Sequence, residues 1–249
     1  YADRLSANIE MPVQEDLDKL APEKTIAEIE NTMTDVKFGI DDARYRGKKS
    51  SFAQAGQSTQ LVVGASKSSD TTILHKAESL YKQFRLRRVY YSAFSPANFT
   101  DPLLRRDPTP PMREHRLYEA DWLIRNYGFA AHEITEGLNG GDLDLLNDPK
   151  LAWALRHREV FPVDVNRAPK SLLLRVPGIG IRNVGRILKI RRYSRVTLAD
   201  LSKLRVSMSR AKWFVVTADH NPDVFKLDSA VLPAVFQPKD IQPSLFDLK

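Results

Sequence analysis

Segments with the hydrophobic patterns of strands and of helices alternate from residue 6 to residue 94, and this alternation restricts the fold most strongly. Short apolar or β-branched runs predict strands at 6–11, 58–65 and 86–94. The intervening stretches, 25–46 and 71–84, carry apolar residues at helical intervals, and Asp70 can cap the second of them. Strands separated by helices pair in parallel through right-handed crossovers. The predicted class is therefore α/β with parallel strands, in a barrel or an open sheet.

In either architecture a ligand site lies at the carboxyl ends of the strands. The residues at those ends are Asn8 and Glu10, Gly64 to Ser66, and Tyr91 to Ser95. We expect any small-molecule site of the first part of the chain to be built from them.

The chain divides by composition into three parts. A proline-rich stretch at 99–114 predicts irregular structure, and apolar spacing predicts a helix over 114–128. Basic residues gather after residue 150, and the chain beyond 221 contains several prolines. The predicted domains are an α/β domain over 1–149, an all-α domain over 150–220 and a loosely ordered tail over 221–249.

The chain contains no cysteine, which excludes disulfides, thiolate zinc sites and cysteine-ligated iron-sulfur clusters within these 249 residues. Its five histidines show no ligand spacing, so we expect no metal site. No apolar run reaches the length of a membrane span, and no signal peptide is recognisable at the start. The expected location is the cytoplasm, without contact with a membrane.

The net charge of +7 is unevenly distributed. Residues 151–220 carry 15 lysines and arginines against 4 acids, a balance of +11, so the remainder sums to −4. A basic segment attached to a slightly acidic remainder is typical of a nucleic-acid-binding module joined to a second domain.

The stretch RVPGIGIRNVGRILKIRR, residues 175–192, lies in this basic segment. It predicts two helices, 168–176 and 181–191, with Asn166 as a cap for the first and a glycine turn at 177–180. Gly185 is expected to let the two helices approach closely. A glycine turn that opens a helix presents backbone N–H groups to a phosphate. The residues predicted to bind DNA are Gly178, Ile179, Gly180, Arg182, Asn183, Arg186, Lys189 and Arg191. The alternative is a turn between two core helices with cations on the outside.

The sequence VPGIGIRNVGRIL resembles the hairpin of helix-hairpin-helix DNA-binding modules, and ADLSKLRVSMSRAKWFV, residues 199–215, resembles their degenerate second copy. More widely, AGQSTQLVVGASKSSD, LRRVYYSAFSP, REHRLYEADWLIRNYGF and DPKLAWALRHREVFPVDVNRAP resemble a family of DNA modification and repair radical S-adenosylmethionine (radical SAM) proteins. This resemblance implies the later strands of a radical SAM barrel followed by a helix-hairpin-helix domain.

The resemblance also implies cofactors and partners. Such enzymes cleave S-adenosylmethionine with a [4Fe-4S] cluster held by three cysteines, and those cysteines are absent from this chain. Two interpretations stay open: the C-terminal part of a radical enzyme that is inactive alone, or a non-catalytic DNA-binding scaffold with a degenerate barrel. DNA is the expected partner, bound by its backbone, and a DNA glycosylase-like protein is a further one.

The predicted cofactor contacts come from two sources. The resemblance points to Asn8 and Glu10 on one strand, and to Val62 and Gly64 on the next. Position alone adds Gln57, Ser58, Gln60, Tyr91 and Ser92. Each polar member of this set can instead make a structural hydrogen bond.

The tail contains a separate short motif. Gln242, Leu245 and Phe246 resemble the peptide by which bacterial DNA enzymes dock on the replication sliding clamp, with Pro243 in place of an apolar residue. A tail that ends in two large apolar side chains suits insertion into a groove. The alternative is that Leu245 and Phe246 pack on their own domain.

Overall fold

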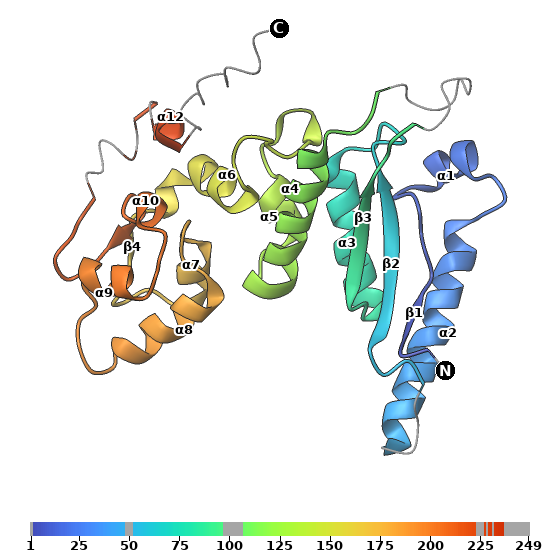
Figure 1. The fold of residues 1–249 in the computed structure, drawn as a ribbon, viewed down its shortest axis with the longest axis horizontal. Helices are drawn as coiled ribbons and strands as arrows, with labels where there is room; N and C mark the ends of the chain where they lie inside the picture. Colours follow the sequence, from blue (N-terminus) through green and yellow to red (C-terminus); the bar gives the residue numbers. More distant parts are fainter. Residues whose placement is uncertain are drawn as a thin grey trace, which may run out of the picture. The chain divides into compact units, whose positions relative to one another are not determined.

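The computed structural model describes residues 2–47, 52–96, 107–222, 227, 229–230 and 232–236. The chain separates into two compact units (Figure 1). The first comprises Tyr1–Ile124 and Phe129–Leu145, and the second comprises Arg125–Gly128 and Leu146–Lys249. The division lies close to the domain boundary that composition suggested.

The first unit contains a parallel sheet of three strands in the order β1 (Arg4–Ser6), β2 (Gly56–Val63) and β3 (Arg88–Ala93). Helix α2 (Ile26–Tyr45) joins β1 to β2, and helix α3 (Asp70–Phe84) joins β2 to β3 (Figure 1). The mixed α/β class with parallel strands is thus confirmed. The first strand begins earlier than predicted, and an isolated bridge between Glu10 and Leu61 resumes the pairing after Ser6.

Alternate residues of β2 face the helices. Gln57 donates from Nε2 to the carbonyls of Met33 in α2 and Phe84 in α3, at 3.1 and 2.8 Å. Leu61 and Val63 lie on the same face of β2, because side chains two residues apart share a face, and both are fully buried. The hydrophobic core of this unit therefore lies between β2 and the two crossover helices.

The outer edge of β3 is capped by side chains. The backbone N–H groups of Val89 and Tyr91 donate to the hydroxyls of Tyr81 and Tyr118, at 2.8 and 3.0 Å. The N–H of Ala93 donates to the Glu114 carboxylate at 2.7 Å. Unpaired edge groups are what a further strand would bind. With these donors occupied, the sheet formed by the described residues ends at β3 and is open rather than closed into a barrel.

The second unit is mainly helical. An aromatic cluster of Trp153, Phe161 and Phe214 forms part of its core, with ring centroids 6.2 and 4.9 Å apart. The predicted all-α domain also contains a short parallel pair, β4 (Val163–Asp164) with β5 (Val215–Val216). Its described helices are α6 (Pro149–Arg156), α7 (Lys170–Arg175), α8 (Ile181–Ile190), α9 (Leu198–Lys203), α10 (Met208–Ala211) and α12 (Leu232–Phe236).

The remaining regular elements are short. Helix α4 (Pro111–Trp122) continues into a π-helical turn. The others are α1 (Gln14–Leu20), α5 (Ala131–Thr135), the π-helical turn Leu123–Tyr127, and 3₁₀ turns at Asn139–Gly141 and Arg158–Val160. Across the described ranges, none of the helices is long and apolar enough to cross a membrane.

The cap of α3 differs from the prediction. Ser69, not Asp70, is the N-cap, and its hydroxyl accepts a hydrogen bond from the Thr72 N–H at 3.3 Å. Asp70 is instead the first helical residue and is completely buried. Its carboxylate accepts hydrogen bonds from Arg113 and from the Leu143 N–H. The sequence could not distinguish these roles, because serine and aspartate both suit an N-cap.

Candidate nucleic-acid interface

The basic stretch folds as a helix, a tight turn and a second helix. Helix α7 ends at Arg175, the turn spans 177–180, and α8 begins at Ile181. Leu173, Val176 and Ile187 are fully buried. Gly178 has φ +83°, the left-handed conformation that glycine adopts without steric cost.

Two carbonyl oxygens of the turn point into the unit. The Gly178 carbonyl accepts a hydrogen bond from the Ser207 N–H at 3.2 Å. The Ile179 carbonyl accepts one from the Lys150 ammonium at 2.7 Å. These two carbonyl oxygens are therefore engaged inside the unit and do not face a phosphate at the surface.

The N-terminus of α8 carries no cap. Its N-cap residue is Gly180, which has no side chain to accept a hydrogen bond. The N–H groups of Gly180, Ile181, Arg182 and Asn183 have no partner among the residues that the structure describes. Unpaired N–H groups at the positive end of a helix dipole bind anions. The first turn of α8 thus offers such a site.

Helix α9 shows the opposite arrangement. Its N-cap Thr197 and the Asp200 side chain cap each other's backbone N–H groups, and Asp219 accepts from the Leu198 N–H at 2.8 Å. Hydrogen bonds from the backbone and hydroxyl of Thr197 lower the pKa of Asp200. Two carboxylates therefore occupy the α9 terminus, so of these two helices α8 is the one whose terminus suits an anion.

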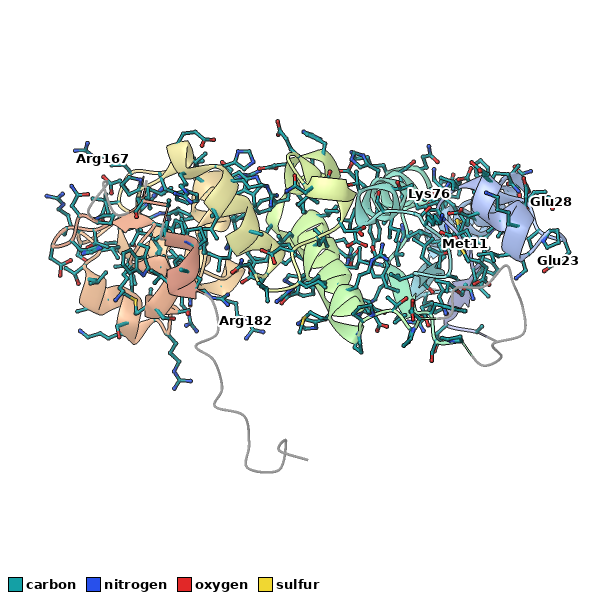
Figure 2. The ribbon with its side chains drawn as sticks, turned by 90° about the horizontal axis from the view of Figure 1, so that it is seen from above. Met11, Glu23, Glu28, Lys76, Arg167 and Arg182 are labelled. Atoms are coloured by element: carbon teal, nitrogen blue, oxygen red, sulfur yellow. The ribbon has the colours of Figure 1, made fainter. Side chains whose placement is uncertain are left out.

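One face of α8 is basic and exposed. Arg182, Arg186 and Lys189 lie on it together with Gly185, at spacings of three and four residues. Figure 2 shows the Arg182 side chain projecting from the ribbon. Within the described part of the chain, none of these three cations makes a hydrogen bond or an ion pair. Their charges are available to an external anion.

The glycines of the hairpin differ in what the fold requires. A Cβ on Gly178 would lie 2.7 Å from the Ser207 carbonyl oxygen, so this residue must be glycine for the two turns to pack. A Cβ on Gly180 would meet nothing closer than the Tyr127 hydroxyl at 3.7 Å. A Cβ on Gly185 would meet nothing within 4 Å.

The expected role of Gly185 in close helix packing is therefore wrong. This residue is exposed on the basic face of α8, while the buried Val184 and Ile187 make the contact with the interior. Glycine in a helix interior costs about 0.5–1 kcal/mol relative to alanine. No contact within the fold requires glycine at this position. The absence of a side chain would, however, allow the backbone of a bound nucleic acid to approach α8 closely.

Arg191 and Asn166 both have internal partners. Arg191 donates from Nη1 to the carbonyls of Val165 and Ala168, at 3.2 and 2.7 Å, so its guanidinium holds the chain before α7. Asn166 does not cap α7, whose N-cap is Pro169. Its side-chain amide instead pairs in both directions with the backbone of Val196, at 2.7 and 3.2 Å.

The predicted second copy forms α9, a turn and α10. Arg205 in that turn has φ +59°, where the first turn has a glycine. The two turns meet through the hydrogen bond between Ser207 and Gly178. Arg210 of α10 forms an ion pair with Asp148, the N-cap of α6. The second copy thus supports the turn of the first through the hydrogen bond between Ser207 and Gly178.

The residues predicted to bind a cofactor occupy several environments in the first unit. The Gln57 side chain points into the helices, as described above. The Ser58 side chain is buried, and its carbonyl accepts from the Ser6 hydroxyl at 3.2 Å. Gln60 and Val62 pair through their backbones with Glu10, at 3.0 and 2.8 Å.

The carboxyl end of β2 is filled by another part of the chain. Gly64 has φ +84°, and a Cβ there would overlap the Thr109 hydroxyl. Thr109 donates from Oγ1 to the Val63 carbonyl and from its N–H to the Phe94 carbonyl, both at 3.0 Å. Thr109, a residue of the proline-rich stretch 99–114, therefore covers the strand end where a cofactor was expected.

The other candidates are tied to their neighbours. Asn8 is exposed and accepts from the Ser6 hydroxyl at 2.6 Å, and Glu10 forms an ion pair with Lys24 at 3.4 Å. The Tyr91 hydroxyl donates to the buried Asp121 at 3.4 Å. Ser92 is half-buried.

The cluster implied by the resemblance does not fit the residues present. Its three thiolate ligands would have to come from a chain without cysteine. Within the described ranges, no group of three or more histidine and acidic side chains is placed to hold a metal ion. The motif Gln242, Leu245 and Phe246 lies outside the described residues, so clamp docking stays a prediction.

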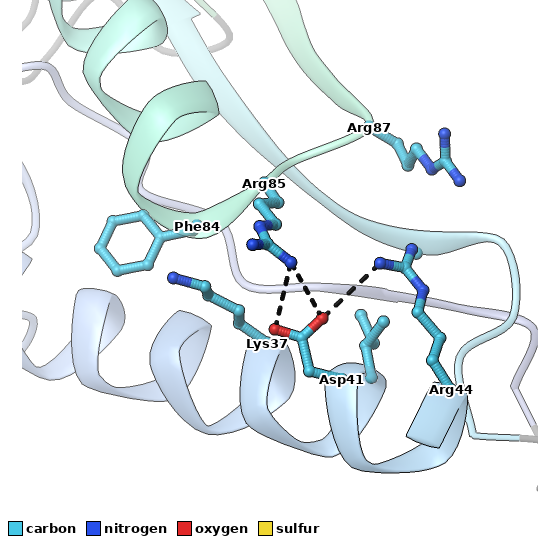
Figure 3. Close-up of a pocket in the computed structure, with 8 residues that line it drawn as sticks. Lys37, Asp41, Arg44, Phe84, Arg85 and Arg87 are labelled. Atoms are coloured by element: carbon cyan, nitrogen blue, oxygen red, sulfur yellow. Dashed lines mark hydrogen bonds and ion pairs between the residues drawn. The ribbon is translucent and has the colours of Figure 1, made fainter. Parts of the chain in front are cut away.

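A small basic pocket lies at the amino end of the sheet (Figure 3). Asp41 accepts from Arg85 at 3.3 and 3.4 Å and pairs with Arg44 at 3.6 Å. The cavity measures about 10 Å³, which is close to the minimum for one water molecule. It is too small to hold an organic cofactor.

Sequence reasoning missed a buried ionic network at the carboxyl end of β2. Arg113 donates from Nε to Asp70 at 2.7 Å, and from Nη2 to the Ser68 carbonyl and to Asp142 at 3.0 and 3.2 Å. Burial raises the pKa of Asp70, while hydrogen bonds from Leu143 and Arg113 oppose that shift. The network joins α3, α4 and the loop near residue 142. No local sequence pattern predicts this network, because its members are distant in sequence.

Comparison of the chain with family models, curated proteins and solved structures returned no match.

Proposed function

We propose that the second unit is a helix-hairpin-helix module that binds the sugar-phosphate backbone of DNA without recognising base sequence. The proposal depends mainly on one observation: α8 combines an uncapped N-terminus with three exposed cations that have no partner among the residues described by the structure. Backbone N–H groups and cations contact phosphate oxygens, which are the same at every base pair. Gly180 and Gly185 leave room for that backbone beside α8.

Replacing Arg182, Arg186 and Lys189 together with alanine is expected to lower the affinity for duplex DNA by about 10- to 100-fold. Each lost phosphate contact reduces the slope of log affinity against log salt by about 0.9, so the slope should fall by up to about 3. Fluorescence anisotropy with labelled duplexes of unrelated sequence, titrated over a range of salt concentrations, measures both quantities.

A control variant that loses three other cations has the same net charge as the hairpin variant. Lys19, Arg46 and Lys82 are exposed cations of the first unit, each paired with an acid four residues away. Their triple replacement by alanine should leave the affinity and the salt slope close to those of the unaltered protein. If both triple variants lost affinity equally, net charge rather than the hairpin would explain the binding.

For the first unit, we retain membership of the radical SAM family of DNA modification and repair proteins as a proposal. It is supported by the sequence resemblance and agrees with the parallel strand-helix-strand order. In this proposal the chain is the part of a cytoplasmic enzyme that brings DNA to a reaction centre. The cluster would have to be held outside these residues.

The coding sequence upstream of Tyr1 tests this second proposal. Three closely spaced cysteines there would support the radical enzyme. An in-frame stop codon would contradict it and favour the non-catalytic DNA-binding scaffold. Neither outcome affects the test of the hairpin, because DNA binding by the second unit is measured separately.

A further inference from the structure

Lys150 is a buried lysine directly beneath the hairpin turn. It is the second residue of α6, and only 8% of its surface is exposed. Its ammonium donates to the Ile179 carbonyl at 2.7 Å and lies 4.7 Å from the centroid of the Tyr127 ring. Lysine is rarely buried to this degree without a paired carboxylate.

Three titratable or charged groups face this ammonium from the surrounding elements. The Tyr127 ring comes from the π-helical turn, and Arg175 comes from the end of α7. Asp148 caps α6, but one of its oxygens accepts from the Leu151 N–H and the other pairs with Arg210. Burial lowers the pKa of Lys150 to about 7, Asp148 opposes that shift, and the charge of Arg175 adds to it.

The hydrogen bond to Ile179 fixes the direction of one peptide group. In a planar trans peptide the carbonyl and the following N–H point in opposite directions. Because Lys150 draws the Ile179 carbonyl inward, the N–H of Gly180 is directed outward, at the start of the uncapped turn. Lys150 also places a positive charge behind the groups that would meet a phosphate.

We propose that Lys150 is a positioning residue of the DNA interface, and that binding of a phosphate by the hairpin is coupled to uptake of a proton by Lys150. This inference depends on the proposed function of the second unit. A nearby phosphate favours the charged ammonium over the neutral amine. The protonated form of Lys150 must in turn favour the bound phosphate, because such coupling is reciprocal.

DNA affinity is expected to depend on pH through the protonation of Lys150. In the free protein, Lys150 loses its proton as the pH rises through about 7. In the complex it keeps the proton to a higher pH. DNA affinity is therefore expected to fall as the pH rises above about 7, by up to about tenfold per pH unit, and to level off at acid pH where Lys150 is charged in both states.

The test compares three forms of the full chain between about pH 6 and about pH 9 at constant salt. Duplex affinity of the unaltered protein should decline with pH. Lys150→Arg should bind without that decline, because arginine stays protonated throughout. Lys150→Met should bind more weakly at neutral pH and show no decline. Circular dichroism checks that each variant is folded.

Three results would overturn the inference. A Lys150→Arg variant that kept the decline would show that the proton is taken up by a group other than Lys150. Calorimetry of the unaltered protein in buffers of different ionisation enthalpy gives a second measurement that needs no variant, and absence of proton uptake there would be decisive. If the protein did not bind DNA at all, the proposed function would fail. A pH-independent affinity would remove only the role of Lys150.

Discussion

Replacing Arg113 with methionine is expected to lower the free energy of unfolding of the first unit by about 3–5 kcal/mol. Methionine keeps the apolar stem but leaves the completely buried Asp70 carboxylate without its cation. Removal of one partner from a buried ion pair has this cost because the remaining charge is neither hydrated nor paired. Hydrogen exchange of amides in α3 and β2, measured during denaturant titration, reports the change.

The loss should depend on pH. Burial already raises the pKa of Asp70, and removal of the guanidinium raises it further. At a pH low enough to neutralise Asp70 in the variant, the difference between variant and unaltered protein should shrink. At neutral pH it should be largest. An equal loss at both pH values would show that lost packing, not the unpaired charge, is responsible.

Lys19→Met is the matched control for this variant. Lys19 pairs with Glu15 in the same unit, but both side chains are more than half exposed. Exposed pairs contribute little to stability because water screens them. The control should show no measurable change in the exchange of α3 and β2. A comparable loss in both variants would contradict the importance assigned to the buried network.

Replacing Gly178 with valine is expected to lower the free energy of unfolding of the second unit by about 2–4 kcal/mol. A β-branched residue strongly disfavours φ +83°, and its Cβ would lie 2.7 Å from the Ser207 carbonyl oxygen and 3.2 Å from the Ala211 nitrogen. These neighbours are backbone atoms that cannot rotate away, so the two turns must separate. Denaturant titration followed by hydrogen exchange in α7 and α10 measures the loss.

Gly185→Ala provides a control of opposite sign within the same hairpin. An added methyl group meets nothing within 4 Å, and alanine favours the helix, so stability should rise by about 0.5–1 kcal/mol. If both glycine variants destabilised the unit, the conclusion that there is room for a side chain at Gly185 would be wrong. A more stable Gly185→Ala with weaker DNA binding would support close approach of the DNA backbone at this residue.

Several features of the fold could be predicted from the sequence. The alternation of strand and helix patterns predicted the parallel pairing of β1, β2 and β3, because short apolar runs separated by helices have few other ways to bury their surfaces. The glycine turn and its two helices followed from spacing that is local to residues 168–191. In both cases the deciding interactions lie close together in the chain.

The sequence alone also determined the concentration of positive charge around the hairpin, since charge is a property of composition. Only the tertiary structure showed which cations are available: among the described residues Arg186 has no hydrogen-bond or ion-pair partner, whereas Arg191 and Arg210 are engaged by groups distant in sequence. The capped edge of β3, the Thr109 side chain against Gly64 and the burial of Lys150 are likewise decided by long-range contacts. Partners of this kind leave no local pattern, because their positions depend on how the whole unit packs.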